Sequence, residues 1–319
     1  MKIIHCSDVH EDFESLTVAA DFAQAKNADK IIVSGDLNLK GYTQQNLESL
    51  ICDRNKSKFR QSIIDKTTDT YNQFKTILDK SDIPYLLVPG NYDMTNIESV
   101  FGNHNLDRKT INENGIKYFG YGGGEQTPMH IANLEDLLSE KPLVIVFDEN
   151  ELYQKLHNEK PNIIITHQPP QGLLDYTVFQ QHWGTTATTQ YLNDCQNNNN
   201  ALPKLILVGH VHESGPYANN AKGFNGIAKF NSTVVVNAGN LGRFDLIEAR
   251  TMSSITGRVL LRGRSPAAVS DREKILDWGT FAEIDAEEDG TAKSVTFYSI
   301  MSPDKKNINT IKEMANYRL

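Results

Sequence analysis

Short apolar runs that end abruptly in polar residues are the feature that most restricts the fold of this chain. Each run is five residues long, and the runs lie at residues 2–6, 30–34, 84–88, 162–166 and 204–208. Short apolar runs rich in β-branched residues are typical of strands that are buried on both faces. We therefore expect a sheet that is at least partly parallel.

Helical periodicity fills two of the intervals between these runs. In residues 13–26 apolar side chains recur at helical spacing, which predicts a strand–helix–strand unit at the start of the chain. Residues 43–80 combine charged side chains with apolar ones at helical spacing, and one or two helices are expected there.

The last third of the chain has a different pattern, in which apolar and polar residues alternate. Strands are predicted at residues 226–230, 233–237, 280–284 and 294–300, with turn residues between the members of each pair. This part should be mainly antiparallel sheet. The polar tail at residues 303–319 is expected to form a terminal helix.

Two groups of strands with helices between them predict an α/β fold, a four-layer αββα sandwich of two mixed sheets flanked by helices. With 319 residues, 39% of them hydrophobic, the chain has enough apolar material for one packed domain over residues 1–319. Residues 43–80 and 168–202 are interpreted as insertions that shape a substrate cleft.

Charge and cysteine content narrow the classes of function and the compartment. A formal net charge of -8 disfavours extended nucleic-acid binding, which usually needs a basic face. The three cysteines are an odd number without metal-type spacing, which favours a reducing compartment. We find neither a secretory signal nor an apolar run long enough for a membrane span, so cytoplasmic residence without a membrane partner is expected.

Five of the predicted strands are followed directly by residues of the types that bind metals. These residues are Asp8 and His10 after the first strand, Asp36 after the second, Asn91 after the third, His167 after the fourth, and His210 with His212 after the fifth. A parallel sheet gathers such residues along one edge. A pair of divalent ions needs a bridging carboxylate and several nitrogen and oxygen ligands, and Asp36 is the best bridge.

In chain order these segments read D-x-H, G-D, G-N-x-D, a lone His and G-H-x-H, and the order resembles the calcineurin-like metallophosphoesterase family over residues 1–242. The resemblance implies a phosphoesterase with two divalent metal ions, in which a hydroxide between the ions attacks phosphorus. It places Asp8, His10 and His212 on one ion, Asn91, His167 and His210 on the other, and Asp36 between them. Nitrogen and oxygen ligands suit manganese, iron, zinc, cobalt or nickel.

One position departs from the family pattern. Where the family has the histidine of G-N-H-D, this chain has Tyr92, so Asp93 lacks the imidazole that it would orient. Tyrosine is a poorer proton donor at neutral pH than an imidazolium. With Asp36 and Asn91, Tyr92 and Asp93 are the residues expected at the catalytic step, and the change favours small phosphodiesters or nucleotides as substrates.

Two further residues are candidates for substrate binding. His182, next to Trp183 in the second insertion, could cap a pocket or contact a base, and packing within the insertion is the competing interpretation. Arg243 follows an Asn- and Gly-rich turn and could pair with a phosphate oxygen.

Other functions stay open for the same set of residues. A phosphomonoesterase or a protein phosphatase is the nearest enzymatic alternative, and a nuclease is disfavoured by the acidic charge. From a different class, a catalytically weak scaffold or binding module of the same fold is also considered. The expected partner of the enzyme is a small phosphorylated substrate.

Overall fold

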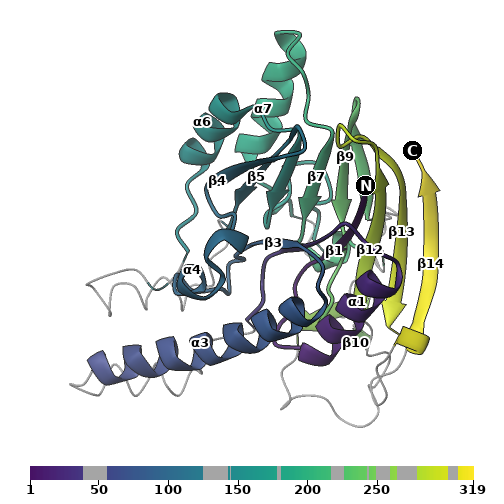
Figure 1. Ribbon diagram of the computed structural model, residues 1–319. Helices are drawn as coiled ribbons and strands as arrows, with labels where there is room; N and C mark the ends of the chain where they lie inside the picture. Colours follow the sequence, from purple (N-terminus) through teal and green to yellow (C-terminus); the bar gives the residue numbers. More distant parts are fainter. Residues whose placement is uncertain are drawn as a thin grey trace.

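Two six-stranded sheets stacked face to face form the centre of the molecule (Figure 1). The computed structural model describes residues 1–38, 56–124, 143, 145–177, 181–216, 226–242, 244–248, 259–263, 279–300 and 308–319. The αββα sandwich expected from the sequence is confirmed.

The first sheet has the strand order β14-β13-β12-β1-β2-β3. Its parallel half contains β1 (Lys2–Cys6), β2 (Lys30–Ser34) and β3 (Tyr85–Val88). Its antiparallel half contains β12 (Gly279–Ala286), β13 (Ala292–Ile300) and β14 (Ile311–Arg318). The chain therefore returns late in the sequence, at Gly279, to pair β12 with β1 at the middle of the sheet.

The second sheet has the strand order β4-β5-β6-β7-β9-β8. Its parallel centre contains β5 (Ile116–Tyr121), β6 (Ile163–Thr166), β7 (Leu205–Val208) and β9 (Thr233–Asn237). The antiparallel edges are β4 (Lys109–Glu113) and β8 (Ile227–Phe230). A separate two-stranded sheet pairs β10 (Phe244–Glu248) with β11 (Val259–Gly263).

Helices cover the outer faces of the two sheets. On the first sheet lie α1 (Phe13–Ala25), α3 (Lys56–Lys80) and α4 (Ile97–Phe101), and on the second lie α6 (Glu149–Glu159) and α7 (Thr186–Asn197). Single 3-10 turns form η1 (Gly102–His104), η2 (His212–Ser214) and η3 (Ile308–Thr310). None of the described helices has the length and apolar character that a bilayer span requires.

Three buried clusters correspond to the three interfaces between these four layers. The middle cluster lies between the sheets and includes Ile32, Ile165 and Phe297, each fully or almost fully buried. The outer clusters join α1 and α3 to the first sheet, and α6 and α7 to the second. Strands with apolar side chains on both faces are needed for this arrangement, which explains the continuous apolar runs.

The C-terminal tail corrects one expectation. Residues 311–318 form strand β14 rather than a terminal helix, and they pair with β13. A register shift opposite Phe297 and Tyr298 inserts one extra residue at Met314, so Met314 and Tyr317 both pack against the core between the sheets. Polar composition did not reveal this strand, because its pairing depends on the free edge of β13.

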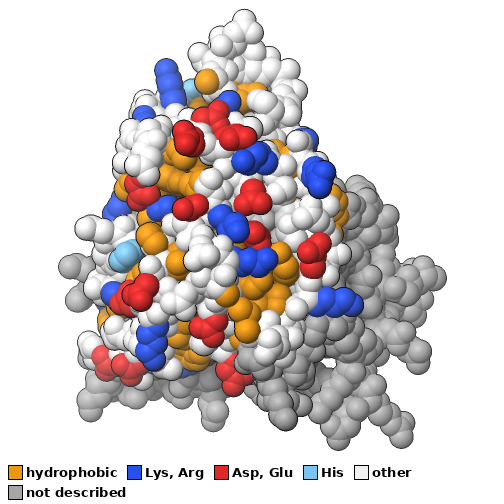
Figure 2. All heavy atoms as spheres, turned by 45° about the vertical axis from the view of Figure 1, so that its right-hand side comes forward, with side chains coloured by type: hydrophobic (Ala, Val, Ile, Leu, Met, Phe, Trp, Pro, Cys, Tyr) orange, Lys and Arg blue, Asp and Glu red, His pale blue; other side chains and the backbone are white. Residues whose placement is uncertain are grey.

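The antiparallel character of the last third is confirmed for β12, β13 and β14 and for the β8–β9 pair. Strand β9 also pairs parallel with β7, so it extends the parallel centre of the second sheet. On the face in Figure 2, basic and acidic side chains are interspersed around small apolar areas, and the described residues form no basic stripe there.

Candidate metal centre

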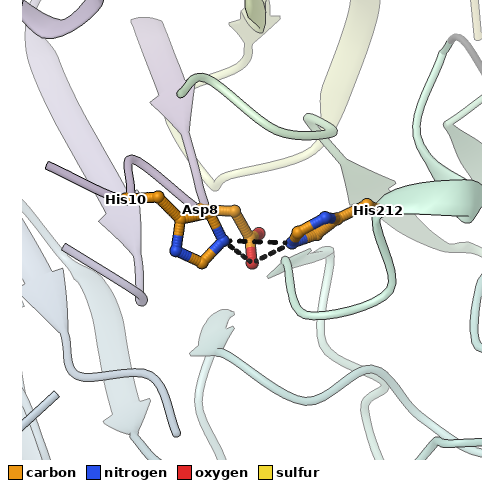
Figure 3. A group of neighbouring side chains, drawn as sticks. All are labelled: Asp8, His10 and His212. Atoms are coloured by element: carbon orange, nitrogen blue, oxygen red, sulfur yellow. Dashed lines mark hydrogen bonds and ion pairs between the residues drawn. The ribbon is translucent and has the colours of Figure 1, made fainter. Parts of the chain in front are cut away.

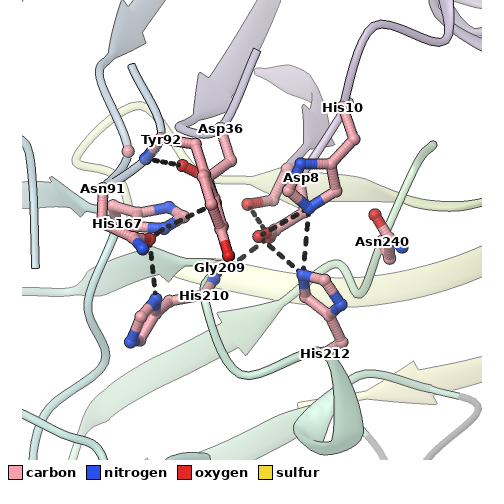
Figure 4. Close-up of polar contacts among 12 residues, drawn as sticks. Asp8, His10, Asp36, Asn91, Tyr92, His167, Gly209, His210, His212 and Asn240 are labelled. Atoms are coloured by element: carbon pink, nitrogen blue, oxygen red, sulfur yellow. Dashed lines mark hydrogen bonds and ion pairs between the residues drawn. The ribbon is translucent and has the colours of Figure 1, made fainter. Parts of the chain in front are cut away.

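The residues singled out from the sequence lie together at one edge of the sandwich (Figure 4). The loops that follow β1, β2 and β3 contribute side chains from the first sheet, and those after β6 and β7 contribute side chains from the second. The residues are Asp8, His10, Asp36, Asn91, His167, His210 and His212. The gathering of strand ends that the parallel pattern predicted therefore occurs, with both sheets taking part.

The backbone of these loops is held in an uncommon conformation. Asp8, His10, Asp36 and His210 have φ values of 52°, 48°, 53° and 66°. A non-glycine residue in this left-handed region costs about 1–3 kcal/mol and persists only where the surroundings enforce it. Hydrogen bonds between the first two loops do so, from the Asp8 amide to the Gly35 carbonyl at 3.0 Å and from the His10 amide to the Asp36 carbonyl at 2.9 Å.

Two glycines allow the loops to approach one another. Gly35 has a φ of 99°, and a Cβ atom there would overlap the His167 ring. A Cβ atom on Gly209 would overlap the Ser7 hydroxyl and would lie 2.6 Å from Asp8 Oδ2. Any larger residue at Gly209 must therefore displace the Asp8 carboxylate or the loop after β7.

The first group of candidate ligands consists of Asp8, His10 and His212 (Figure 3). His212 Nε2 lies 3.0 Å from Asp8 Oδ1 and 3.3 Å from His10 Nε2, and Asp8 Oδ1 lies 3.9 Å from His10 Nε2. His10 Nδ1 lies 3.2 Å from the Asn38 carbonyl oxygen. Because a carbonyl oxygen can only accept, Nδ1 carries the proton and Nε2 presents its lone pair to the group.

The second group surrounds the side-chain oxygen of Asn91. Asn91 Oδ1 lies 2.9 Å from His167 Nε2 and 3.1 Å from His210 Nδ1, and His167 Nε2 lies 3.5 Å from Asp36 Oδ2. His167 Nδ1 donates to the Ser34 carbonyl at 2.8 Å, which turns Nε2 toward Asn91. Because Nδ1 carries a proton, Nε2 faces the Asn91 oxygen either as the N–H of an imidazolium or as a lone pair beside a cation, and a set of nitrogen and oxygen atoms of this kind suits a metal ion.

The carboxylates of the centre are buried but ionised. Burial by itself raises the pKa of Asp8, yet the nearby imidazoles of His212, His167 and His10 together outweigh burial and hold this pKa far below its usual range. Burial likewise raises the pKa of Asp36, and the His167 and His10 imidazoles together lower it by more. Both side chains are at most 2% exposed, so two negative charges are held away from water beside imidazoles.

The imidazoles respond to the same field in opposite directions. Burial opposes protonation of His167, but the Asp36 and Asp8 carboxylates overcome it and raise its pKa to about 9. Burial and the nearby His167 charge lower the pKa of His210 to about 3, and burial lowers the pKa of His10. The centre thus attracts positive charge at His167 and keeps other imidazoles in the neutral form that ligates metals.

The sequence profile of the calcineurin-like phosphoesterase family matches residues 1–214. The chain belongs to this family. The resemblance inferred from the ordered motifs is confirmed, and the matched segment contains all seven candidate ligands. Asp8 is common to both groups of three carboxylate and imidazole ligands, Asp8–His10–His212 and Asp8–Asp36–His167.

Relatives of this calcineurin-like phosphoesterase extend the comparison. An uncharacterized protein of Methanocaldococcus jannaschii is 27% identical over 161 residues, which are 48% of this chain and 62% of the relative. One crystal structure covers 83% of this chain and 99% of its own, with 18% identity and a TM-score of 0.54. The structure of a dimetal phosphatase from Danio rerio matches 94% of this chain and 95% of its own length, with 12% identity and a TM-score of 0.50. The two structures support the fold.

Tyr92 follows Asn91 in the loop after β3, at the position where the sequence resemblance leads us to expect a histidine. Its ring centroid is 5.8 Å from that of His10, in an edge-on arrangement, and its backbone amide donates to Asp36 Oδ1 at 2.8 Å. Burial and then the Asp36 and Asp8 carboxylates raise the pKa of the Tyr92 hydroxyl to about 12. The hydroxyl is therefore protonated at neutral pH and is a very weak acid there.

Asp93 has partners that the sequence did not reveal. It is fully buried, and its carboxylate accepts from the amides of Gly90, Asn38 and Leu37 at 2.8, 3.1 and 3.2 Å. It also accepts from the Tyr71 hydroxyl of α3 at 3.2 Å. Asp93 thus ties the loops after β2 and β3 to the helix layer, which positions Asp36 and Asn91 between them.

Asn240 is a neighbour of the centre that the sequence did not single out (Figure 4). It is 1% exposed, and among the described residues neither atom of its carboxamide has a hydrogen-bond partner. Its loop is fixed against the first strand's loop, because the Leu241 amide donates to the Ser7 carbonyl at 2.9 Å and the Gly242 amide to that of Asp8 at 3.0 Å. Arg243, the neighbour proposed from the sequence, lies outside the described residues.

His182, the other candidate for substrate binding, is next in the chain to a residue that lies beside the centre. His182 is 47% exposed, and its Nδ1 lies 2.8 Å from Asp175 Oδ1. The ring of Trp183, the next residue, has its centroid 6.1 Å from that of His210. Within residues 168–202, the part before α7 thus lies beside the metal centre at Trp183, and α7 belongs to the outer helix layer.

Proposed function

We propose that this chain is a metal-dependent phosphoesterase that hydrolyses small phosphate esters. The observation that carries the proposal is the convergence of carboxylate, imidazole and carboxamide atoms in two adjacent groups, at 2.9 Å between Asn91 and His167 and 3.0 Å between Asp8 and His212. Such sets of nitrogen and oxygen atoms bind divalent cations. The match to the calcineurin-like phosphoesterase family supports the same conclusion.

The residues of the chain divide between two ion positions in this proposal. Asp8, His10 and His212 hold one ion, Asn91, His167 and His210 hold the other, and Asp36 lies between them. Two divalent ions bound there would supply an activated water as nucleophile and neutralise the phosphate oxygens. The backbone carbonyls of Asn38 and Ser34 orient His10 and His167, so that each presents Nε2 to its ion.

Ligand chemistry supports manganese, iron, zinc, cobalt or nickel, because nitrogen and oxygen donors are combined without thiolate. Both free cysteines among the described residues, Cys6 and Cys195, are buried and belong to apolar clusters. We select manganese as the first metal for reconstitution.

The leaving-group side of the reaction supports a preference for phosphodiesters or nucleotides. Tyr92, with its pKa raised to about 12, can donate a hydrogen bond but does not release a proton at neutral pH. General-acid catalysis is typically worth roughly 10²- to 10⁴-fold. An enzyme without it turns over best those esters whose leaving groups need little protonation.

The test is hydrolysis of bis-p-nitrophenyl phosphate and p-nitrophenyl phosphate by protein loaded with each of the five metals, with and without a chelator. We expect chelator-sensitive hydrolysis with the diester favoured. Faster hydrolysis of the monoester would instead support a phosphomonoesterase or protein phosphatase. Absence of chelator-sensitive hydrolysis with every metal would support the scaffold function.

A further inference from the structure

The segment that follows His167 forms a compact hairpin, which we call the 169–185 hairpin; its residues 169–177 and 181–185 are described. The Thr185 amide donates to the Pro169 carbonyl at 2.8 Å, and the Gln171 amide to the Thr185 carbonyl at 3.0 Å. Nearer the tip, the Trp183 amide donates to the Asp175 carbonyl at 2.9 Å. The two arms are thus held together along their length.

Two contacts fix this hairpin to the loops of the metal centre. The Gln168 side chain, next to His167, donates to the Trp183 carbonyl at 2.9 Å. Ser214, two residues beyond His212, donates from its hydroxyl to the Tyr176 carbonyl at 3.3 Å. The hairpin therefore has a defined position relative to the candidate ligands, as a preorganised binding surface requires.

Trp183 is the aromatic group of the hairpin that lies nearest to the centre. Its ring is half-buried and is tilted by 39° relative to the His210 ring, with 6.1 Å between the centroids. Trp183 lies outside the three buried apolar clusters, and its indole N–H donates to Gln181 Oε1 at 3.4 Å. A tryptophan ring is a large planar group that favours aromatic partners. The position beside His210 puts this surface next to the second ion position.

His182 adds an oriented polar group beside the same ring. Its Nδ1 is held at 2.8 Å by Asp175, whose carboxylate is 1% exposed and also accepts from the Gly184 amide at 3.2 Å. The Tyr176 ring lies edge-on to the imidazole at 5.1 Å. Among the described residues Nε2 has no hydrogen-bond partner, so the buried carboxylate fixes an imidazole whose second nitrogen can bind a ligand.

We propose that Trp183 and His182 form a subsite for a nucleobase carried by the phosphate ester. Trp183 stacks on the face of the base, and His182 bonds to its polar edge through Nε2. The inference rests on the proposed function, because the phosphate of the same molecule would lie at the metal centre. The competing explanation is structural, in which Trp183 packs on His210 and holds that ligand in place.

The experiment measures binding of three phosphonates to the manganese-loaded full chain by calorimetry. They are the non-hydrolysable analogue of AMP with a methylene in place of the 5′ ester oxygen, benzylphosphonate, and methylphosphonate. We expect the AMP analogue to bind best. Trp183→Leu should weaken its binding about tenfold, as expected for the loss of one base–aromatic stack, and Trp183→Phe should restore most of it. Methylphosphonate binding should not change.

His182 has an exposed side chain, and His182→Ala should weaken binding of the AMP analogue about threefold, as expected for the loss of one hydrogen bond. Binding of benzylphosphonate should not change. Intrinsic fluorescence gives an independent measure, because the chain has only two tryptophans, Trp183 and Trp278. Binding of the AMP analogue should quench the tryptophan fluorescence of the wild type. Most of this quenching should be absent in Trp183→Phe. This signal does not depend on turnover.

Equal weakening of all three phosphonates in Trp183→Leu, together with reduced manganese affinity, would overturn the subsite in favour of the structural role. Equal binding of benzylphosphonate and the AMP analogue would overturn the assignment to a nucleobase. Hydrolysis of p-nitrophenyl esters with no base-dependent binding would remove the subsite and leave the proposed function intact. Base-dependent binding without hydrolysis would support the subsite and contradict the proposed phosphoesterase activity.

Discussion

The metal centre and the 169–185 hairpin lie side by side but are built in opposite ways. At the centre, five of the seven candidate ligands are buried and the other two are partly buried, and left-handed backbone at four ligands is supported by hydrogen bonds between loops. In the hairpin, His182 is 47% exposed and Trp183 is half-buried. The sheets thus fix the groups that would act on phosphorus, while an exposed segment between strands presents the groups that would select the rest of the substrate.

The largest effect should come from a direct change at the centre. Asp36→Asn removes the carboxylate between the two groups, and we expect a fall in phosphodiesterase turnover on the order of 10³-fold. Far-UV circular dichroism should stay unchanged, because the amide has the same shape. Treatment of the wild type with EDTA should cause a similar loss that manganese reverses. A variant that keeps more than a tenth of wild-type activity would contradict the role of Asp36.

Loop packing around the ligands provides the next test. Gly209→Ala places a Cβ atom against Ser7 and Asp8, and we expect about a 10²-fold loss of metal affinity and activity, as for the loss of strong ligand support. Gly124→Ala is the matched control, since its Cβ atom would lie 3.6 Å or more from Gln168, Asn91 and His210. Manganese titration of both variants measures the difference, and equal effects would argue against close packing as the cause.

Tyr92→His tests the weak leaving-group side of the centre. An imidazole at this position can protonate a leaving group, so turnover of p-nitrophenyl phosphate should rise by roughly tenfold, below the full range for general acids. The gain should be present at low pH and lost as pH rises through the imidazole pKa, because only the imidazolium donates. In the wild type, whose Tyr92 pKa is raised to about 12, this residue should contribute no such limb below pH 9.

Tyr92→Phe is the control for that experiment. It removes the hydroxyl but keeps the ring beside His10. Diesterase turnover should change by less than about threefold, which corresponds to one modest hydrogen bond. A large loss in Tyr92→Phe, or an unchanged monoesterase rate in Tyr92→His, would show that the leaving-group side does not limit the reaction.

The smallest effect is expected from a substitution of Asn240, which should raise the stability of the protein and lower its activity. Its carboxamide is buried without a partner among the described residues, which costs about 1–3 kcal/mol. Asn240→Leu should therefore raise the free energy of unfolding of the metal-free protein by about 1 kcal/mol while lowering activity several-fold. Urea denaturation with chelator present gives the first quantity.

Asn237→Leu provides the contrast, because the Asn237 side chain donates to the Val211 carbonyl at 3.0 Å and accepts from the Gly239 amide at 2.8 Å. This substitution leaves both partners unsatisfied and should destabilise the protein by about 2 kcal/mol or more. Destabilisation of similar size at both positions would mean that Asn240 is satisfied in solution.

The sequence revealed those parts of the molecule that depend on local pattern. Strands β1, β2, β3, β6 and β7 are continuous apolar runs, and their carboxyl ends had to meet once the strands were parallel. The sequence pattern alone therefore predicts that the candidate ligands are neighbours in space. The resemblance to the family also drew attention to Tyr92, where a histidine is expected.

Other features depend on contacts between distant segments and were not predictable from local pattern. The clamp formed by Asp93 needs amides from two loops and a hydroxyl from α3. Strand β14 needs the edge of β13 and a bulge at Met314. The contact of His182 with Asp175 needs the turn of the hairpin, and the burial of Asn240 without a hydrogen-bond partner among the described residues depends on how the surrounding loops pack.

The origin of the ligands from both sheets has a mechanical consequence. Asp8, Asp36 and Asn91 come from loops of one sheet, and His167, His210 and His212 come from loops of the other, so each ion position spans the two halves of the sandwich. Ions bound there would hold the loops of the two sheets together at the edge of the sandwich where the ligands lie. Loss of metal would then free the two halves to hinge apart at that edge, where amide exchange should begin, while β8 and β14 at the sheet margins stay unaffected by metal.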